Sequence, residues 1–223
     1  MTIFTTLKKT LAFLLIFENF SCYVYSSKLK IRNENDFTPG IKNITLKIVT
    51  AKDQIDALIQ SGFDLSLRLS IIYTRLEKGA LTCLVFVDKE LASMECAATN
   101  AAAKQGIDIY PCKIDFDHKE AYAGGVWTNP KYRGKGLHLY AYYKIYDYLR
   151  EQGIVTVKSI VEVHNTAALK AHARFAPEEK IEAKAHYLRL LGLHFWWRLR
   201  YKQAGAKAMD GGMPNGDMGD THG

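Results

Sequence analysis

The stretch TNPKYRGKGLHLYAYYKIYDYLREQG, residues 128–153, decides the fold that we expect for this sequence. A strand pattern ends at Pro130, and a short loop then leads into an apolar periodicity that predicts a long helix over 136–150. The first N–H groups of such a helix have no partners inside it, and the helix dipole adds partial positive charge at the same end. Glycines in the loop let a ligand approach the backbone, and basic side chains add full charge. These loop residues are Lys131, Arg133, Gly134, Lys135 and Gly136. The stretch therefore predicts an anion-binding site at a helix start.

Two well-known phosphate-binding patterns do not match this loop. The GxxxxGK[ST] spacing is absent, and so is the three-glycine dinucleotide fingerprint. A glycine-containing turn between a strand and a helix, with exposed basic residues, is the plain structural alternative. The loop residues taken alone leave both interpretations open.

The rest of the chain predicts a mixed α/β architecture with one central sheet. Period-two patterns and β-branched runs predict strands over 44–48, 81–87, 91–99, 120–128, 155–163, 181–187 and 193–199. Apolar spacing with glycine stops predicts further helices over 51–60, 65–77 and 166–174. The runs 81–87 and 91–99 are close enough to form a hairpin, whereas 100–118 has no clear pattern.

We expect one folded domain over 28–203, with a distinct segment at each end. The apolar run over 11–17 is too short to span a bilayer, which needs about 20 apolar residues. Its leucines fit one helical face, so residues 1–27 predict an apolar helix that packs on the domain or lies on a membrane surface. Two lysines before the run also fit a cleaved signal peptide, and this alternative stays open. Residues 204–223 lack an apolar period and predict a disordered tail.

Composition limits the class of protein. The chain has 223 residues, of which 48% are hydrophobic and 24% are charged, and these values exclude a largely disordered chain or a multi-span membrane protein. The net charge of +7 suits phosphate-bearing ligands, nucleic acid or anionic membranes. Cysteines 22, 83, 96 and 112 form no CxxC pair, so neither a zinc site nor a disulfide scaffold is indicated. We expect free thiols, a cytoplasmic location and no bound metal.

Residues 130–137, Pro-x-Tyr-Arg-Gly-Lys-Gly-Leu, resemble motif A of the GNAT N-acetyltransferase superfamily. In that family the pattern Gln/Arg-x-x-Gly-x-Gly/Ala binds the pyrophosphate of acetyl-CoA. Arg133 and Gly136 match its first and fourth positions, and His138 stands at the sixth, where Gly or Ala is usual.

A second resemblance follows at the spacing of the family. Asn165-Thr-Ala-Ala168 is similar to the Asn-x-x-Ala that opens the next helix. In many members a tyrosine seven residues after this asparagine protonates the departing CoA thiolate, and here that position is His172. The Gly-Phe that usually ends the helix is replaced by Ala176-Pro177. The resemblance covers about residues 44–200.

The resemblance implies a single GNAT-like domain of the α/β (α+β) class. Its sheet would be mixed, mostly antiparallel, flanked by helices, and splayed between the strand before motif A and the strand ending at Val163. It also implies an acyl-CoA-dependent N-acyltransferase, with acetyl-CoA as co-substrate and a primary amine, small or on a protein, as acceptor. Backbone N–H groups of 126–128 would polarise the thioester carbonyl. The implied co-substrate residues are Val126, Trp127, Thr128, Arg133, Gly134, Lys135, Gly136, Leu137, His138 and Asn165.

The resemblance also suggests catalytic side chains. His172 is the candidate acid, because an imidazole can give up a proton near neutral pH; a lone histidine on a helix is more often packed, and only its position favours the role. Glu95 interrupts an apolar strand, where burial raises a carboxyl pKa, and Glu120 lies on a neighbouring strand. We rank both ahead of Glu162 as the base.

Three alternatives remain beside this interpretation. The chain could be a non-catalytic module that binds acyl-CoA or another anion. A nucleic-acid binder is disfavoured, because the basic residues are spread along the chain and no RRM, KH or helix-turn-helix signature is present. The aromatic and basic run over 190–202 predicts a last strand, or else contact with an anionic membrane. The acceptor is not readable from this sequence.

Overall fold

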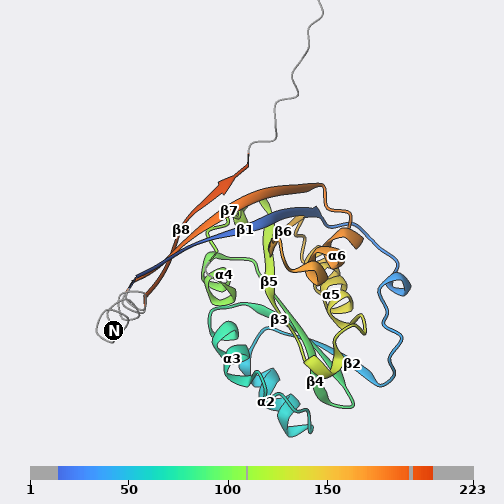
Figure 1. The fold of residues 1–223 in the computed structure, drawn as a ribbon. Coiled ribbons are helices and arrows are strands. Elements are labelled where there is room, and N and C mark those ends of the chain that lie inside the picture. Colours follow the sequence, from blue (N-terminus) through green and yellow to red (C-terminus); the bar gives the residue numbers. More distant parts are fainter. Residues whose placement is uncertain (1–14, 109, 191–192, 203–223) are drawn as a thin grey trace, which may run out of the picture.

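The computed structural model describes residues 15–108, 110–190 and 193–202, and these form one sheet with helices on both of its faces (Figure 1). Within the described residues the sheet has eight strands. The strands are β1 (Leu15–Lys28), β2 (Ile44–Val49), β3 (Leu81–Val87), β4 (Glu90–Ala98), β5 (Glu120–Thr128), β6 (Thr156–Glu162), β7 (Glu179–Leu190) and β8 (Leu193–Tyr201). The expected α/β class with one central sheet is therefore confirmed.

Two groups of helices cover the sheet. The helices α2 (Lys52–Gln60), α3 (Leu69–Glu77) and α4 (Ala101–Ile107) lie on one face. The helices α5 (Leu137–Glu151) and α6 (Thr166–Arg174) lie on the other (Figure 1). Short 3-10 turns occupy Glu34–Asp36, Phe116–His118 and Pro130–Tyr132. No described helix has both the length and the hydropathy needed to cross a bilayer.

The strand β3 shows how the core is divided. Successive side chains of a strand point to opposite faces, so a strand that is covered on both sides is apolar throughout. All seven residues of β3 are buried. Cys83 and Val85 pack in the cluster that includes α5, whereas Leu84 and Phe86 pack in the cluster that includes α2 and α3. The helix α5 contributes its buried face to the first cluster through residues such as Leu137, Ala141, Ile145 and Leu149.

The strand order is β2-β3-β4-β5-β6-β1-β7-β8. Every neighbouring pair is antiparallel except β5 and β6, which are parallel. These two strands pair only where Glu120–Tyr122 faces Thr156–Lys158. Beyond this short ladder they separate, and the sheet opens into a V. A mixed, mostly antiparallel sheet, splayed at this strand, is the arrangement that the resemblance implies.

A β-bulge interrupts β5 at the start of the splay. Met94 pairs with Trp127 and Cys96 pairs with Gly124, so Gly125 and Val126 together stand opposite Glu95. Gly125 has a φ of +66°, and a Cβ there would lie 2.7 Å from the guanidinium of Arg75. The positive φ is what favours a glycine at this position, because other residues rarely adopt it. The bulge turns backbone groups of β5 away from the ladder.

The amino-terminal segment differs from the expectation. The sequence predicts a helix over 1–27, but Leu15–Lys28 forms β1, a strand between β6 and β7. Cys22 and Val24 are buried in one cluster, while Tyr25 and Ser27 are buried as well. A strand that is buried on both faces lacks the alternation that identifies an isolated strand, so no strand was predicted over these residues. Residues 1–14 and the predicted disordered tail, 204–223, lie outside the described residues.

Most other predicted elements are confirmed to within a few residues. No element is predicted over 100–118, where the structure has α4. The signal was present, because Asn100 precedes three alanines and its side chain accepts a hydrogen bond from the N–H of Ala103 at 2.9 Å. The run over 190–202 contains β8, as one of the two alternatives predicted, but most of its side chains are not described.

Candidate active site

A cavity of about 910 Å³ lies where β5 and β6 separate. Its wall combines the far part of β5, the end of β6, the loop before α5, the first turns of α5 and the inner side of α6. The predicted residues in this wall are Glu95, Val126, Trp127, Thr128, Arg133, Gly134, Gly136, Leu137, His138, Asn165 and His172. The structure therefore brings most of the predicted site together.

The loop before α5 forms one end of this cavity. Asn129 caps a 3-10 turn, and Gly134 and Gly136 then adopt φ values of +76° and +80°. Gly136 is the N-cap of α5, and the first helical bond runs from Tyr140 N–H to its carbonyl at 3.0 Å. The N–H groups of residues 137–139, which lie between Gly136 and Tyr140, have no partner inside the helix. Arg133 is exposed, and its Nε donates to the Thr128 carbonyl at 3.3 Å.

This loop end fits an acyl-CoA pyrophosphate on two grounds. Gly134 has nothing within 4 Å of an added Cβ, so a ligand can approach its backbone closely. The free N–H groups, the positive end of α5 and the Arg133 guanidinium all favour a negative charge at the same place. Lys135 is exposed but is not part of the cavity wall, and its Nζ lies 5.7 Å from the centre of the Tyr132 ring.

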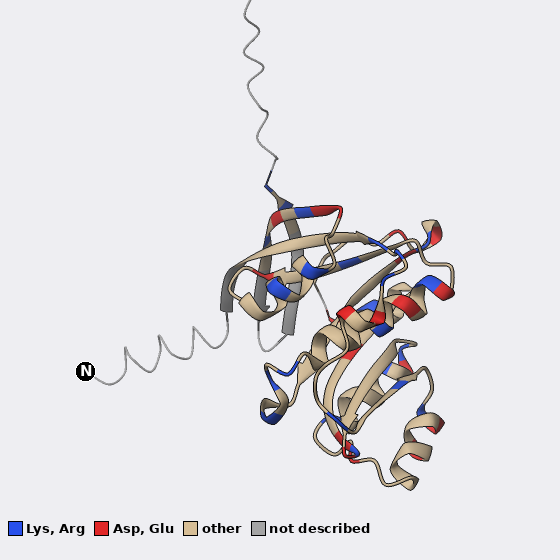
Figure 2. Ribbon diagram, turned by 90° about the vertical axis from the view of Figure 1, so that its right-hand side faces the viewer, with Lys and Arg blue, Asp and Glu red and all other residues tan. Residues whose placement is uncertain are grey.

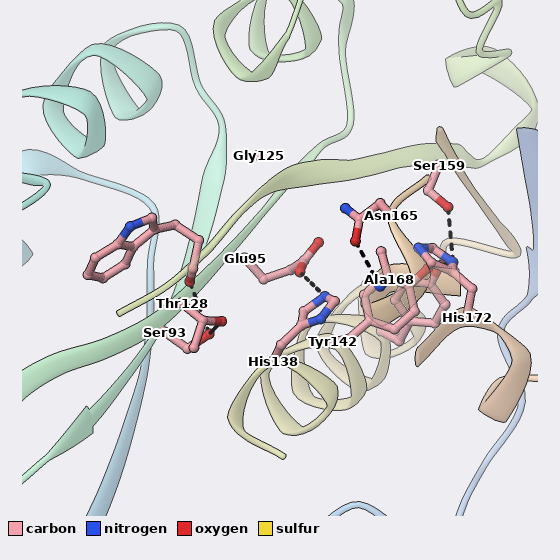
Figure 3. A network of polar contacts seen from close by, with 12 residues as sticks. Ser93, Glu95, Gly125, Thr128, His138, Tyr142, Ser159, Asn165, Ala168 and His172 are labelled. Atoms are coloured by element: carbon pink, nitrogen blue, oxygen red, sulfur yellow. Dashed lines mark hydrogen bonds and ion pairs between the residues drawn. The ribbon is translucent and has the colours of Figure 1, made fainter. Parts of the chain in front are cut away.

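A buried carboxylate lies near the middle of the cavity. The Glu95 side chain, from β4, is 0% exposed, and its burial raises the pKa of the carboxyl. His138, from the first turn of α5, faces it with Nε2 3.3 Å from Oε2 (Figure 3). The two groups are in contact but not aligned, and neither carboxylate oxygen has a hydrogen bond. The His138 side chain thus turns toward Glu95.

His172 belongs to a second buried network (Figure 3). Its Nδ1 lies 2.9 Å from the Tyr142 hydroxyl and 3.4 Å from the Ser159 hydroxyl. Its ring stacks on Tyr25 of β1, with centroids 4.6 Å apart, and the Tyr146 hydroxyl contacts that of Tyr142. Burial lowers the pKa of His172 to about 3, with His138 adding a smaller effect in the same direction. The imidazole is therefore neutral near pH 7.

The other predicted residues have different surroundings. The Asn165 side chain caps α6 by accepting from the N–H of Ala168 at 3.1 Å. Glu120 does not line the cavity; it lies at the start of β5, where Lys158 Nζ is 2.6 Å from its Oε2. This position corrects the expectation that Glu120 could act as a base, because an ion-paired carboxylate outside the cavity cannot reach the reacting groups. Glu162 lines the cavity and accepts from the Tyr110 hydroxyl at 2.9 Å.

The segment after α4 supplies residues that were not singled out from the sequence. Asp108 and Tyr110 line the cavity, and Tyr110 bonds to Glu162 of β6. Asp108 is held by Lys104 Nζ at 3.0 Å and by the Tyr122 hydroxyl. No residue pattern marks this segment, and only the chain path brings it to the cavity. Elsewhere in the described chain, Lys and Arg occur together with Asp and Glu on α2, α3, α5 and β7 (Figure 2).

Comparison with known proteins bears on the segment that forms this cavity. The profile of the Acetyltransferase (GNAT) family matches residues 70–176, which contain β3 to β6, the bulge, the glycine loop and the helices α5 and α6. Among the curated proteins, none matches this sequence.

Several solved structures are similar to this chain at low identity. One is a Drosophila protein, with 12% identity, a TM-score of 0.49, and coverage of 85% of this chain and 58% of that one. A candidate acetyltransferase of the GNAT family from Novosphingobium aromaticivorans has 15% identity, a TM-score of 0.48, and coverage of 78% and 67%. An acetyltransferase from the GNAT family of Colwellia psychrerythraea has 14% identity, a TM-score of 0.45, and coverage of 82% and 57%. This chain thus spans between 57% and 67% of the length of these three proteins.

The family match falls on the same residues that carry the motif A pattern, the splayed sheet and the loop at the start of α5. Residues 70–176 of this chain therefore carry a domain of the GNAT acetyltransferase family.

Proposed function

We propose that this protein is an acyl-CoA-dependent N-acyltransferase that transfers an acetyl group from acetyl-CoA to a primary amine. The family implies acyl transfer from a CoA thioester. The observation that carries the proposal is the meeting of three features in one cavity: the splay of β5 from β6, the bulge opposite Glu95, and the glycine loop before α5.

Each feature has a role in the proposed binding of the co-substrate. The loop N–H groups and Arg133 hold the pyrophosphate. The pantetheine arm lies along the exposed edge of β5 between Gly125 and Thr128, which no longer pairs with β6. Backbone N–H groups of this edge polarise the thioester carbonyl, because fixed dipoles in a cavity act on charge that develops during reaction. Holding the amine and the thioester together removes much of the entropic barrier to attack.

The proton for the departing sulfur needs a donor near α6. A pKa of about 3 leaves His172 without a charged proton to give near pH 7. We propose that the pair of Tyr142 and His172 supplies it, with the tyrosine hydroxyl as the neutral donor, since both line the cavity and lie in contact. Of the two base candidates ranked first, Glu95 lines the cavity and Glu120 does not.

A non-catalytic module that binds acyl-CoA is the second candidate. The observation that favours it is His172, which is buried and neutral at the position where the family commonly has its acid. Such a protein would bind acetyl-CoA and release no thiol from it. A cytoplasmic location and contact with a membrane surface are kept as proposals; the four cysteines form no disulfide, as expected in a reducing compartment.

Calorimetric titration of the full chain with acetyl-CoA tests the proposal. We expect micromolar binding that weakens at least tenfold in Arg133→Ala, since a charge-assisted contact to phosphate is worth roughly 1.5–3 kcal/mol. Lys113→Ala is a matched control, because this exposed lysine is not part of the cavity wall.

Thiol release from acetyl-CoA with a panel of primary amines then separates the two candidates. The panel contains spermidine, glucosamine, tyramine and a lysyl dipeptide. Release with an amine supports the transferase, and binding without release supports the binding module. A folded chain that binds neither acetyl-CoA nor a longer acyl-CoA contradicts both.

A further inference from the structure

Glu95 is the least satisfied charged group that lines the cavity. Its side chain is fully buried, and neither oxygen has a hydrogen-bond partner. An isolated buried carboxylate is costly unless a cation or a donor meets it. The neighbouring basic groups are Arg75, whose guanidinium bonds to the Gly125 carbonyl and to Cys96, and His138. Because Arg75 is engaged elsewhere, His138 is the group left to interact with the carboxylate directly.

His138 lies between this carboxylate and the cavity. Its side chain is 21% exposed, whereas that of Glu95 is 0% exposed. Its Nε2 is the buried atom that approaches Oε2, at 3.3 Å. A carboxylate that faces one ring nitrogen fixes the proton there and leaves the other nitrogen able to accept. The ring nitrogen that does not face this carboxylate is Nδ1, and the histidine itself lines the cavity.

We propose that His138 is the catalytic base of this enzyme and that Glu95 is its positioning residue. The inference rests on the proposed function, and it deepens it by assigning the first proton transfer. The acceptor enters as an ammonium ion and gives one proton to Nδ1 of His138. Glu95 holds the Nε2 proton and balances the charge of the resulting imidazolium, as a buried carboxylate does for other catalytic imidazoles.

The remaining protons and electrons then balance. The free amine forms the C–N bond, and the C–S bond breaks with its electron pair leaving on sulfur. The amine nitrogen loses its second proton as the amide forms, and the thiolate gains one from the Tyr142 hydroxyl near α6. The second amine proton returns to that hydroxyl through solvent, so the donor is unchanged after each turnover. The proton on His138 returns to solvent, so one proton is released for each amide formed.

The groups around this pair set its electrostatics. The charge of Arg75, from α3, lowers the pKa of Glu95. Glu95 in turn raises the pKa of the Cys83 thiol, which comes from β3. From α5, the Tyr142 ring stands 6.0 Å from that of His138, and from α6, His172 faces it as a neutral ring near pH 7. Glu95 is thus the only carboxyl group among the side chains that these contacts identify in the described structure.

Single variants of the full chain test the assignment. His138→Ala and Glu95→Gln should each lower kcat by about 10²- to 10⁴-fold, the usual contribution of a positioned base. The affinity for acetyl-CoA should stay within threefold by calorimetry, since neither side chain is assigned to the pyrophosphate. His164→Ala is the matched control, because this histidine is exposed and outside the cavity wall.

Chemical rescue separates a base from a structural group. Free imidazole should raise the rate of His138→Ala at least tenfold. It should have no such effect in the double variant that also carries Glu95→Gln, because the carboxylate is needed to orient the added imidazole. His138→Asn keeps the test valid if the alanine variant does not fold. A folded His138 variant with a kcat within threefold of that of the unchanged chain would overturn the role of His138 as base. It would leave the proposed function standing.

A second measurement does not depend on the acceptor. Histidine ¹⁵N spectra should show His138 protonated at Nε2, with this preference lost in Glu95→Gln. A proton fixed at Nδ1 would overturn the pairing. If the unchanged chain does not bind acetyl-CoA, the proposed function fails and the base role fails with it. If the chain binds acetyl-CoA and His138→Ala turns over at an unchanged rate, only the base role fails.

Discussion

A single buried residue shows how far position and chemistry can differ. His172 stands where the family pattern has its acid, yet its side chain is only 5% exposed and is stacked on Tyr25. Burial disfavours the charged imidazole, so the pKa falls to about 3. The position could be read from the sequence, but the protonation state could not, because the stacking ring comes from a strand about 150 residues away in the chain.

This burial predicts a dependence of stability on pH. The pKa of His172 is about 3 in the folded chain and near 6.5 without burial, so the unfolded chain takes up the proton first as the pH falls. The stabilising contribution is complete above about pH 6.5 and is lost progressively down to about pH 3. Between pH 6.5 and 5 the loss should be about 2 kcal/mol, as each pH unit in this window costs about 1.4 kcal/mol.

Urea unfolding of the full chain and of His172→Gln at several pH values measures this effect. The free energy of unfolding should fall less steeply with decreasing pH in the variant. His164→Gln is the control, because that histidine is exposed. Parallel curves for the unchanged chain and His172→Gln would contradict the burial of a neutral imidazole.

Local signals fixed the boundaries of some elements. The predicted ranges 120–128 and 166–174 are the bounds of β5 and α6 in the structure. In both cases capping or turn residues lie next to a clear period, such as Asn165 at the start of α6. The helix α4 was missed although Asn100 caps it, because one turn of alanines gives no apolar stripe.

The cap of α6 allows a test of what Asn165 does. Its side chain already accepts from Ala168 N–H, so Asn165→Ala should lower the unfolding free energy by about 1 kcal/mol, and Asn165→Asp should retain most of it. Thermal melts with acetyl-CoA titrations measure both quantities. Full stability with a tenfold loss of acetyl-CoA affinity in Asn165→Asp would instead indicate a direct contact with the co-substrate.

The position of β1 is a property of the whole molecule. This strand lies between β6 and β7 and joins the motif A half of the sheet to the last hairpin. Val24 pairs with Ile160 on one side and Ile181 on the other, and it is 6% exposed. A proline in a central strand removes one ladder hydrogen bond and clashes with its neighbours.

Val24→Pro should therefore destabilise the whole domain by at least about 1–3 kcal/mol, because the lost ladder bond leaves a buried carbonyl without its donor. The loss in Val24→Ala should be smaller, because alanine keeps the backbone ladder and removes only two methyl groups. Thermal unfolding of the full chain compares the two. Equal melting temperatures for Val24→Pro and Val24→Ala would contradict a central β1.

The sequence by itself determined the α/β class, most of the elements and the glycine loop at the start of α5, because caps, glycines and apolar periods act over a few residues. Contacts between distant segments were decided only by the tertiary structure. Strand pairing placed β1 inside the sheet, ended the β5–β6 ladder after Tyr122 and Lys158, and set Glu95 against His138 across two elements. Local patterns cannot encode such pairs, since a strand covered on both faces and a buried charge are defined by partners far away in the chain.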